Sequence, residues 1–162
     1  MTQPKIAIFA GSFDPITIGH VDLIERGSRL FDEIIVLIAV NPNKTYAFDL
    51  ESRATFIKKS VAHLPNVKVD ILSSGLVADY ARKVGATALL RGVRNASDSD
   101  YEQTLAAVNT HIYPELETIV LYAKETHRYI SSSVVRELLL HQGDIASLVP
   151  NVIHEQLLNT FK

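Results

Sequence analysis

The segment Gly11–His20, which reads GSFDPITIGH, is where residue types and spacing point most clearly to chemistry. It follows the apolar run Ile6–Ala10 and precedes a helix-like pattern, so a strand turns tightly into the start of a helix. Free backbone N–H groups and the positive end of a helix dipole meet at such a place, which suits a phosphate. Gly11 permits the tight turn, Gly19 leaves room beside a phosphate, and His20 can donate to its oxygens.

Other well-known sites are disfavoured by the same segment and by the remaining histidines. Asp14 and Pro15 form a common turn pair, and the segment matches neither the Walker A pattern nor G-x-G-x-x-G. A P-loop kinase and a dinucleotide dehydrogenase are therefore not expected. A zinc site and a nucleophile elbow are not expected either, because no metal-ligand spacing occurs among the helical histidines. These are His63, His111, His141 and His154.

Basic side chains follow two further apolar runs. Lys44 closes Asn41–Lys44 after the second run, and Arg91 and Arg94 flank a glycine after the fourth. Lysine acts on a phosphate as a point charge, whereas an arginine fork matches two phosphate oxygens. Each of these residues taken alone could equally be a solvated turn residue, so their shared position after strands carries the argument.

A serine-rich segment, Tyr129–Glu137, forms the fourth polar cluster. Ser131 or Ser132 can cap a helix, and the same free N–H groups and hydroxyls also form an anion site. The acidic residues Asp98, Asp100 and Glu102 fall at a helix start, where carboxylates suit the macrodipole.

Continuous apolar runs alternate with helical spacing along the whole chain, which predicts an α/β fold with a parallel sheet. The predicted strands are Lys5–Ala10, Glu33–Val40, Val67–Leu72, Ala86–Leu90 and Glu117–Tyr122. The predicted helices after the first are 50–64, capped by Asp49; 77–84, ended by Gly85; 101–112, followed by Pro114; one from Ser131 or Ser132 to Leu140; and Pro150–Phe161. Ligands of such sheets bind beyond the carboxyl ends of the strands, where the polar clusters fall.

The amino-acid composition agrees with a single α/β domain and excludes some partners and kinds of site. The 162 residues suit a single domain with a full core, and 47% hydrophobic and 21% charged residues are ordinary for a globular chain. A net charge of −2 argues against nucleic acid as a partner, and the absence of cysteine excludes disulfides and thiolate metal sites. No apolar run reaches membrane-spanning length, and the N-terminus is unlike a signal peptide, so a cytoplasmic protein without a membrane partner is expected.

The motifs together resemble the nucleotidyltransferase superfamily, with its T/H-x-G-H and I-S-S-T-like motifs. Those motifs are Gly11–His20, Arg91–Arg94 and Ile130–Arg136. The resemblance is greatest to the bacterial phosphopantetheine adenylyltransferases and covers essentially the whole chain, including its length and the run His141–Asp144. It implies a Rossmann-like, doubly wound sheet of about five parallel strands with helices on both faces.

The resemblance also implies a reaction and roles for residues. ATP and 4′-phosphopantetheine would give 3′-dephospho-coenzyme A and pyrophosphate with Mg²⁺, the penultimate step of coenzyme A synthesis. His20, Lys44 and Arg91 would be catalytic. Ser12, Lys44, Val77 and Arg91 would bind phosphopantetheine. ATP would contact Ser12, Phe13, His20, Gly92, Val93, Arg94, Glu102, His127, Arg128, Tyr129, Ile130, Ser131, Ser132 and Ser133.

Further expectations come from the same resemblance. The chain would form a homohexamer, for which the helix Tyr101–Tyr113 is a candidate contact, and coenzyme A would inhibit it by feedback.

Because the second pKa of a phosphate monoester is about 6, the acceptor is already a nucleophile at neutral pH. The protein then has to align two anions and neutralise charge rather than supply a base.

Two other readings stay open on the sequence alone. The chain could be another small adenylyl- or cytidylyltransferase that acts on nicotinate mononucleotide, flavin mononucleotide or glycerol 3-phosphate. It could also be a regulator that binds a nucleotide on the same fold without catalysis. The acceptor that supports pyrophosphate release would distinguish another transferase from a phosphopantetheine adenylyltransferase. ATP binding without pyrophosphate release would indicate the regulator.

Overall fold

The computed structural model of the chain describes residues 2–161. Its strands are β1 (Ile6–Gly11), β2 (Glu33–Ala39), β3 (Val67–Leu72), β4 (Ala88–Val93) and β5 (Glu117–Tyr122). Its helices are α1 (Ile18–Ser28), α2 (Leu50–Ser60), α3 (Val77–Val84), α4 (Ala96–Ile112), α5 (Ser132–Leu140) and α6 (Asn151–Thr160), with a short 3-10 turn, η1 (Glu125–His127). The predicted alternation of strands and helices is confirmed, and β3 and β5 have the predicted bounds.

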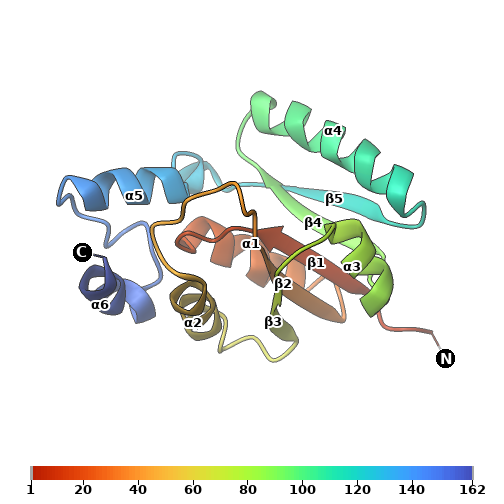
Figure 1. Cartoon of the computed structure of the whole chain (residues 1–162), viewed down its shortest axis with the longest axis horizontal. Coiled ribbons are helices and arrows are strands. Elements are labelled where there is room, and N and C mark those ends of the chain that lie inside the picture. Colours follow the sequence, from red (N-terminus) through yellow and green to blue (C-terminus); the bar gives the residue numbers. More distant parts are fainter. Residues whose placement is uncertain (1, 162) are drawn as a thin grey trace.

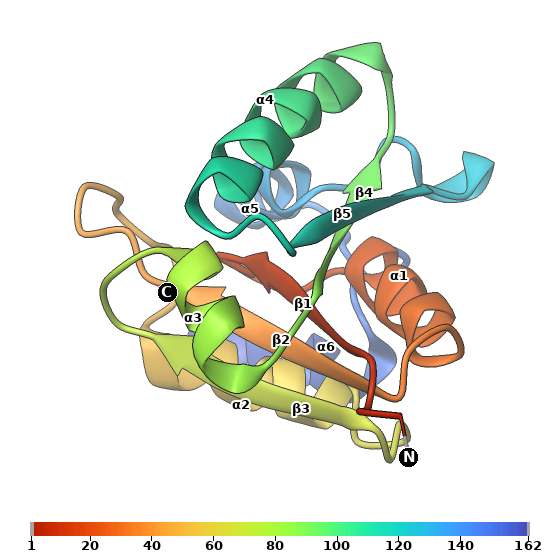
Figure 2. The ribbon, with the colours of Figure 1, turned by 90° about the vertical axis from the view of Figure 1, so that its right-hand side faces the viewer.

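All five strands run parallel, in the order β3-β2-β1-β4-β5. The chain therefore moves outward from β1 to β3 and then crosses back to β4, so the order reverses between β1 and β4. Helices cover both faces: in Figure 2, α3 lies in front of the sheet and α2 and α6 lie behind it. Figure 1 shows α5 and α6 on the same side of the molecule as α2, away from α4. The predicted Rossmann-like, doubly wound α/β fold is confirmed.

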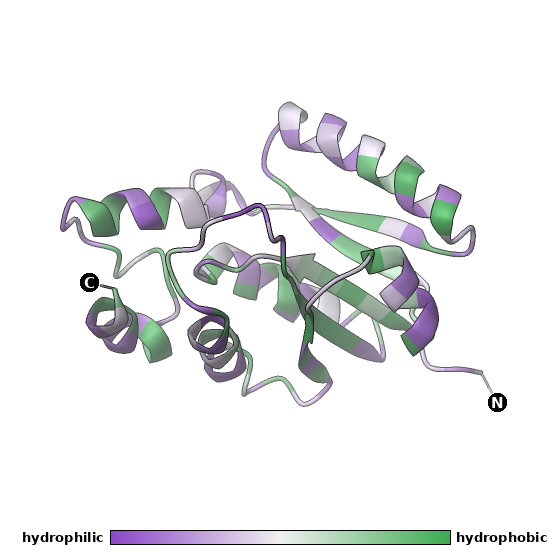
Figure 3. Ribbon diagram, viewed as in Figure 1, coloured by the Kyte–Doolittle hydropathy of each residue, from purple (hydrophilic) through white to green (hydrophobic). Residues whose placement is uncertain are grey.

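The two faces of the sheet pack differently. Side chains such as Phe9 and Val36 point to the larger core, which α1, α2, α5 and α6 complete. Alternate residues such as Ile8 and Leu37 point to a smaller core that α3 covers. The central strands are hydrophobic along most of their length (Figure 3), as expected for strands buried on both faces.

A crevice opens where β1 and β4 meet. The register between these strands pairs Ala7 with Ala88 and Ile8 with Leu89, whereas β1 pairs with β2 along its whole length. Beyond these two pairs the strands no longer form a ladder. The carbonyl of Ala10 instead accepts a hydrogen bond from Nη1 of Arg91 at 2.8 Å. The switch point is thus where the sheet offers space and donors to a ligand.

Two of the predicted boundaries are wrong in the part that carries the site. β4 runs to Val93 rather than Leu90, because Arg91, Gly92 and Val93 pair with β5 despite the glycine. Arg91 therefore lies within the strand, and its position is fixed by the sheet. α4 begins at Ala96, five residues before the first apolar residue of its pattern, because Asn95 caps it and its first turn is polar.

The predicted end of α2 is also wrong. The helix stops at Ser60 and is followed by a turn, in which the amide of Leu64 donates to the carbonyl of Val61. Leu64 nevertheless packs against the core. Its position continued the helical spacing of apolar residues, although the backbone there is no longer helical. The predicted cap Asp49 is confirmed, as is Gly85, which ends α3 with a φ of 77°.

Candidate active site

A cavity of about 410 Å³ lies beyond the carboxyl ends of β1 and β4. It gathers most of the predicted site residues from five separate parts of the chain. These are Ser12, Phe13, His20, Lys44, Arg91, Gly92, Arg94, Glu102, His127, Ile130, Ser131, Ser132 and Ser133. The polar clusters that follow successive strands therefore meet at one site.

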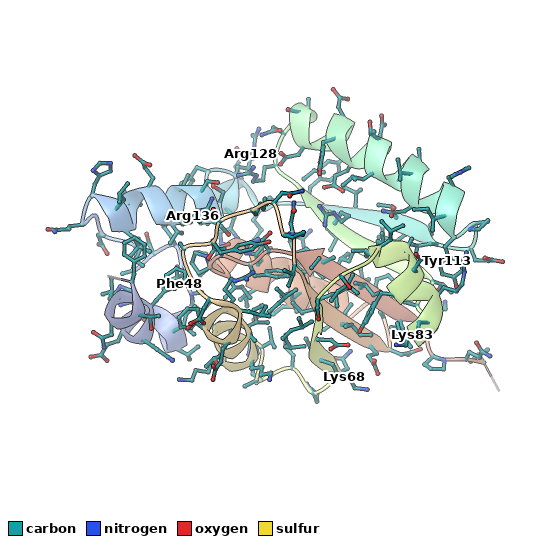
Figure 4. All side chains as sticks on the ribbon, viewed as in Figure 1. Phe48, Lys68, Lys83, Tyr113, Arg128 and Arg136 are labelled. Atoms are coloured by element: carbon teal, nitrogen blue, oxygen red, sulfur yellow. The ribbon has the colours of Figure 1, made fainter. Side chains whose placement is uncertain are left out.

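Four predicted residues lie elsewhere. Val93 and Arg128 line a neighbouring hollow, and Figure 4 shows Arg128 between α5 and the start of α4. Tyr129 is largely exposed and lines neither space. Val77 lines a smaller cavity of about 140 Å³, which shares Ala10, Arg91 and Glu102 with the main one.

His20 is held by the turn before α1. The backbone N–H of Thr17 donates to Nδ1 of His20 at 3.0 Å, and the hydroxyl of Thr17 accepts from the backbone N–H of His20 at 3.3 Å. These contacts form a reciprocal helix cap. Since a backbone N–H can only donate, Nδ1 carries a lone pair and the proton of the neutral ring is on Nε2. His20 is thereby prepared to donate from Nε2.

The surroundings keep that ring neutral. Burial, together with the nearby charges of Arg94 and Arg91, lowers the pKa of His20 from 6.5 to about 4. The buried ring of Phe13 packs edge-on against it, with centroids 5.1 Å apart. Phe13 was expected to contact ATP, and its side chain in this structure supports His20. Its φ of 48° places it in the left-handed region, which fits the tight turn.

Arg91 is fixed on three sides. Its Nε and Nη2 donate to the two carboxylate oxygens of Glu102, both at 2.8 Å, and its Nη1 donates to the carbonyl of Ala10. Glu102 is 6% exposed. A paired fork of this kind is strong and fixes direction. Arg91 keeps further N–H groups beyond these contacts, whereas both oxygens of Glu102 are already engaged, so in this structure Glu102 orients Arg91.

Arg94 also lines the cavity. Its backbone N–H and Nε both donate to Oδ2 of Asp98, at 3.0 and 3.1 Å, and its carbonyl accepts from Nε of Arg128. Arg128 therefore supports the backbone around Arg94 rather than facing the cavity.

The start of α5 closes the site from the other side. Ser131 is the cap, its hydroxyl accepting from the N–H of Val134 at 3.2 Å, and Ser132 donates to the carbonyl of Pro15 at 2.7 Å. Arg136 donates to the carbonyl of Asp14 at 2.8 Å, and Figure 4 shows it beside α5. The helix N-terminus is therefore tied directly to the loop that carries His20.

Lys44 reaches the site from the long connection between β2 and α2. Its Nζ lies 3.4 Å from the hydroxyl of Ser12. Ser12 and Lys44 are 32 residues apart in the sequence, so their proximity confirms that the two polar loops share the site.

Several lining residues escaped the sequence analysis, among them Thr17, Asp98, Tyr101 and Arg136. Arg136 is the last residue of the motif Ile130–Arg136, and its spacing from the serine cap was a usable signal. Gly92 also has a packing role, because a Cβ there would stand 2.3 Å from a methyl of Leu23. Among residues 2–161, no three His, Asp or Glu side chains gather as a metal site, and no helix has the length and apolar character to cross a bilayer.

Comparisons with known proteins agree with this geometry. Residues 8–138 match the cytidylyltransferase-like family. The chain is 49% identical to the phosphopantetheine adenylyltransferase of Streptococcus pneumoniae (strain CGSP14), over 98% of both chains. It is 45% identical to that of Bdellovibrio bacteriovorus, again over 98% of both, and 48% identical to that of Herpetosiphon aurantiacus, over 90% of this chain and 87% of the relative.

Solved structures support the fold. A putative nicotinate-nucleotide adenylyltransferase from Vibrio parahaemolyticus superposes with a TM-score of 0.69 at 24% identity, over 97% of this chain and 93% of that one. A bifunctional NMN adenylyltransferase/ADP ribose pyrophosphatase from Francisella tularensis gives 0.66 at 16% identity, over 91% of this chain and 44% of that one.

Proposed function

This chain belongs to the phosphopantetheine adenylyltransferases of the cytidylyltransferase-like family, and on that premise we propose how its residues carry out adenylyl transfer. The enzyme transfers the adenylyl group of ATP to 4′-phosphopantetheine, giving 3′-dephospho-coenzyme A and pyrophosphate, in coenzyme A biosynthesis. The observation that carries the residue assignment is the convergence of His20, Lys44 and Arg91 on one cavity.

The reaction joins two anions, and the donors of the cavity suit that task. A phosphate oxygen of the acceptor attacks the α-phosphorus of ATP, and the bond from that phosphorus to the bridging oxygen of pyrophosphate breaks. The acceptor needs no general base, since its phosphate is mostly dianionic at neutral pH. His20 donates from Nε2 to an oxygen of the α-phosphate, with a hydrogen bond that strengthens as charge develops in the transition state.

Two cations serve the acceptor phosphate in this proposal. Lys44 lies beside Ser12, and the fork of Arg91 is already oriented by Glu102. Triphosphate and adenosine would lie against Arg94 and the start of α5, where N–H groups and hydroxyls suit an anion.

The smaller cavity beside Arg91 suits the pantetheine arm. It adjoins the proposed phosphate site through Arg91 and is lined by apolar side chains, among them Val77 and Leu105. Asn109 supplies an amide there, which matches the amide groups of pantetheine. An acceptor without such an arm would leave this cavity unfilled, which favours 4′-phosphopantetheine over smaller phosphates.

We propose that Mg²⁺ enters with ATP rather than on a site of the protein. The carboxylates that line the cavity already accept hydrogen bonds: Asp14 from backbone N–H groups, Asp98 from Arg94 and Glu102 from Arg91. Mg²⁺ commonly uses substrate phosphates and water with few carboxylates. Bound in that way, it would offset charge on the triphosphate.

The homohexamer expected from the family is proposed here on the exposed surface of α4 and β5. Val108 on α4, and Val120 and Tyr122 on β5, are all exposed. Exposed apolar side chains that gather on one surface commonly mark a protein contact. We also propose a cytoplasmic location, and inhibition by coenzyme A, since that molecule contains both halves of the product and fits the same cavities.

Pyrophosphate release measured with a panel of acceptors tests the proposal. ATP and Mg²⁺ are supplied with 4′-phosphopantetheine, nicotinate mononucleotide, flavin mononucleotide or glycerol 3-phosphate in separate reactions. Release with 4′-phosphopantetheine alone is expected. Release with another acceptor alone would keep the role of His20 and overturn the assignment of the smaller cavity. ATP binding without release in any reaction would indicate a regulator.

A further inference from the structure

The segment from residue 40 to 49 carries Lys44 and has no regular secondary structure. Most of its residues are exposed, Lys44 included. Such a segment normally moves, and a moving lysine makes a poor preformed site for an anion. The contact between Lys44 and Ser12 therefore needs an explanation from the residues that hold this segment against the loop after β1.

Arg53 of α2 contacts both segments with one guanidinium. The residue is 2% exposed. Its Nη1 donates to the carbonyl of Ser12 at 2.9 Å, and its Nε donates to the carbonyl of Phe48 at 3.1 Å. Phe48 is itself anchored, because its ring packs against Phe56 with centroids 5.4 Å apart (Figure 4 shows Phe48 close to α2). Arg53 therefore joins the backbone of Ser12 to the buried end of the Lys44 segment.

The same guanidinium supports the exposed end of that segment through Tyr46. Its central carbon lies 3.9 Å from the centre of the Tyr46 ring. The hydroxyl of Tyr46 accepts from the backbone N–H of Asn41 at 2.9 Å, and the carbonyl of Asn41 accepts from the N–H of Lys44 at 3.1 Å. The turn that presents Lys44 is therefore held by a ring that stacks on Arg53.

Asp14 provides a second connection between the same two segments. Its two carboxylate oxygens accept from the backbone N–H groups of Ala47 and Phe48, at 2.8 and 2.9 Å. Asp14 is buried, and its backbone carbonyl accepts a hydrogen bond from Nη1 of Arg136. Charged acceptors make stronger hydrogen bonds than neutral ones, so this pair of contacts holds the segment firmly.

We propose that Arg53 and Asp14 are positioning residues, which hold Ser12 and Lys44 together as one preformed site for the acceptor phosphate. The inference rests on the function proposed above, in which Ser12 and Lys44 meet that phosphate. Neither residue touches substrate in this proposal. Each acts through the segment it fixes, so loss of either should weaken acceptor use more than ATP use.

Kinetics of Arg53→Gln test the proposal when combined with Lys44→Ala. Arg53→Gln should raise KM for phosphopantetheine about tenfold, with KM for ATP nearly unchanged, because a small misplacement of a binding group is costly. In the Lys44→Ala background the same substitution should add much less, since residues that act through one another are not additive. Equal rises in both KM values, or full additivity, would overturn the proposal.

Tyr46→Phe provides a milder variant in case Arg53→Gln folds poorly. It removes the hydroxyl that holds Asn41 and keeps the ring that stacks on Arg53, and a severalfold rise in acceptor KM is expected. Ser60→Ala is the matched control, because its buried hydroxyl on the same helix donates only to the carbonyl of Phe56. It should leave both KM values unchanged. An unchanged acceptor KM in Tyr46→Phe would contradict the proposed chain of contacts.

A second readout does not depend on the reaction. Trypsin cleaves after lysine in mobile segments, so the rate of cleavage after Lys44 in the folded protein reports how firmly the segment is held. Arg53→Gln and Asp14→Asn should cleave there several times faster than wild type, and Ser60→Ala should not. Unchanged cleavage would overturn the positioning role. Failure of the wild type to use phosphopantetheine would instead overturn the proposed function, so the two failures are distinguishable.

Discussion

The two halves of the active site are held in place by different means. The half built from the loop after β1, the Lys44 segment and the start of α5 is tied together by contacts within the chain, including those of Asp14, Arg53 and Ser132. The half built from β4, α4 and β5 depends on Arg91 and Glu102, and α4 buries little besides Glu102 among its 17 residues. Hydrophobic residues remain on the outer surface of α4 (Figure 3).

The two halves therefore differ in how far contacts within one chain fix their geometry. The first half is organised before any ligand or partner arrives. In the second half, the edge strand β5 and the helix α4 bury few side chains, so the geometry of this half gains from whatever covers that surface. We therefore expect substitutions in the first half to act on chemistry and acceptor binding, and substitutions on the outside of α4 to act through assembly.

The largest effect is expected from His20→Ala in the first half. Removal of one preorganised donor typically lowers the rate about 10²–10³-fold. Steady-state kinetics should show that loss in kcat, with a much smaller change in KM for ATP. Equal losses in both parameters would assign His20 to ground-state binding of ATP instead.

Glu102→Gln tests the second half. It replaces the carboxylate that orients Arg91 with an amide, which cannot accept from both arms of the fork. We expect kcat/KM for phosphopantetheine to fall about 10–100-fold, because Arg91 would lose the paired contact that orients its fork and a small misplacement of a binding group is costly. Asp100→Asn, an exposed change on the same helix, is the control and should be neutral. A neutral Glu102→Gln would show that Arg91 keeps its position without the carboxylate of Glu102.

Val108→Asp tests whether the second half depends on assembly. A carboxylate on the exposed apolar side of α4 should reduce assembly, seen as a smaller particle in light scattering coupled to gel filtration. Activity should fall severalfold if α4 depends on that contact, through looser placement of Glu102 and Arg91. A control on the far side of the molecule, Lys58→Asp, should change neither. Wild-type protein that runs as a monomer would contradict the proposed hexamer.

The smallest effect concerns pH and the neutral state of His20. The unfolded chain binds a proton at His20 near its ordinary pKa of 6.5, whereas the folded chain resists until about pH 4. Between these values the unfolded state holds more protons, so the free energy of unfolding falls as pH falls, by at most about 1.4 kcal/mol per pH unit. The lowered pKa values of Asp22 and Asp49 act below this window.

His20→Gln should remove that part of the pH dependence. Glutamine keeps the reciprocal cap with Thr17 but does not titrate. Melting temperatures measured from pH 7 to pH 4 should therefore fall less steeply in the variant than in wild type. Parallel curves would show that His20 is protonated in the folded protein over this range.

Much of the fold could be predicted, because continuous apolar runs fix the buried strands and polar clusters follow them. The crossing from β3 to β4 brought those clusters to one edge, as the rule for parallel sheets requires. The length of β4 could not be predicted, since pairing with β5 overrides the local effect of Gly92. The polar first turn of α4 likewise has no apolar period to detect.

Contacts between side chains that are distant in the sequence could not be predicted from it. Glu102 was assigned to ATP, although its partner in the structure is Arg91, eleven positions before it. Arg53 gave no signal at all, because an arginine on an amphipathic helix is normally solvated, and only the packed structure shows it buried between two loops. Phe13 lines the cavity and its ring packs against His20, whereas Arg128 lies outside the cavity and pairs with Glu125.

The central claim is that this cavity exchanges an adenylyl group between pyrophosphate and phosphopantetheine, and the reverse reaction tests it most directly. Dephospho-coenzyme A, pyrophosphate and Mg²⁺ are incubated with wild type and with His20→Ala, and ATP is measured as it forms. The account predicts steady ATP formation by the wild type and a rate about 10²–10³-fold lower in the variant. No ATP from the wild type, or equal rates from both proteins, would contradict it.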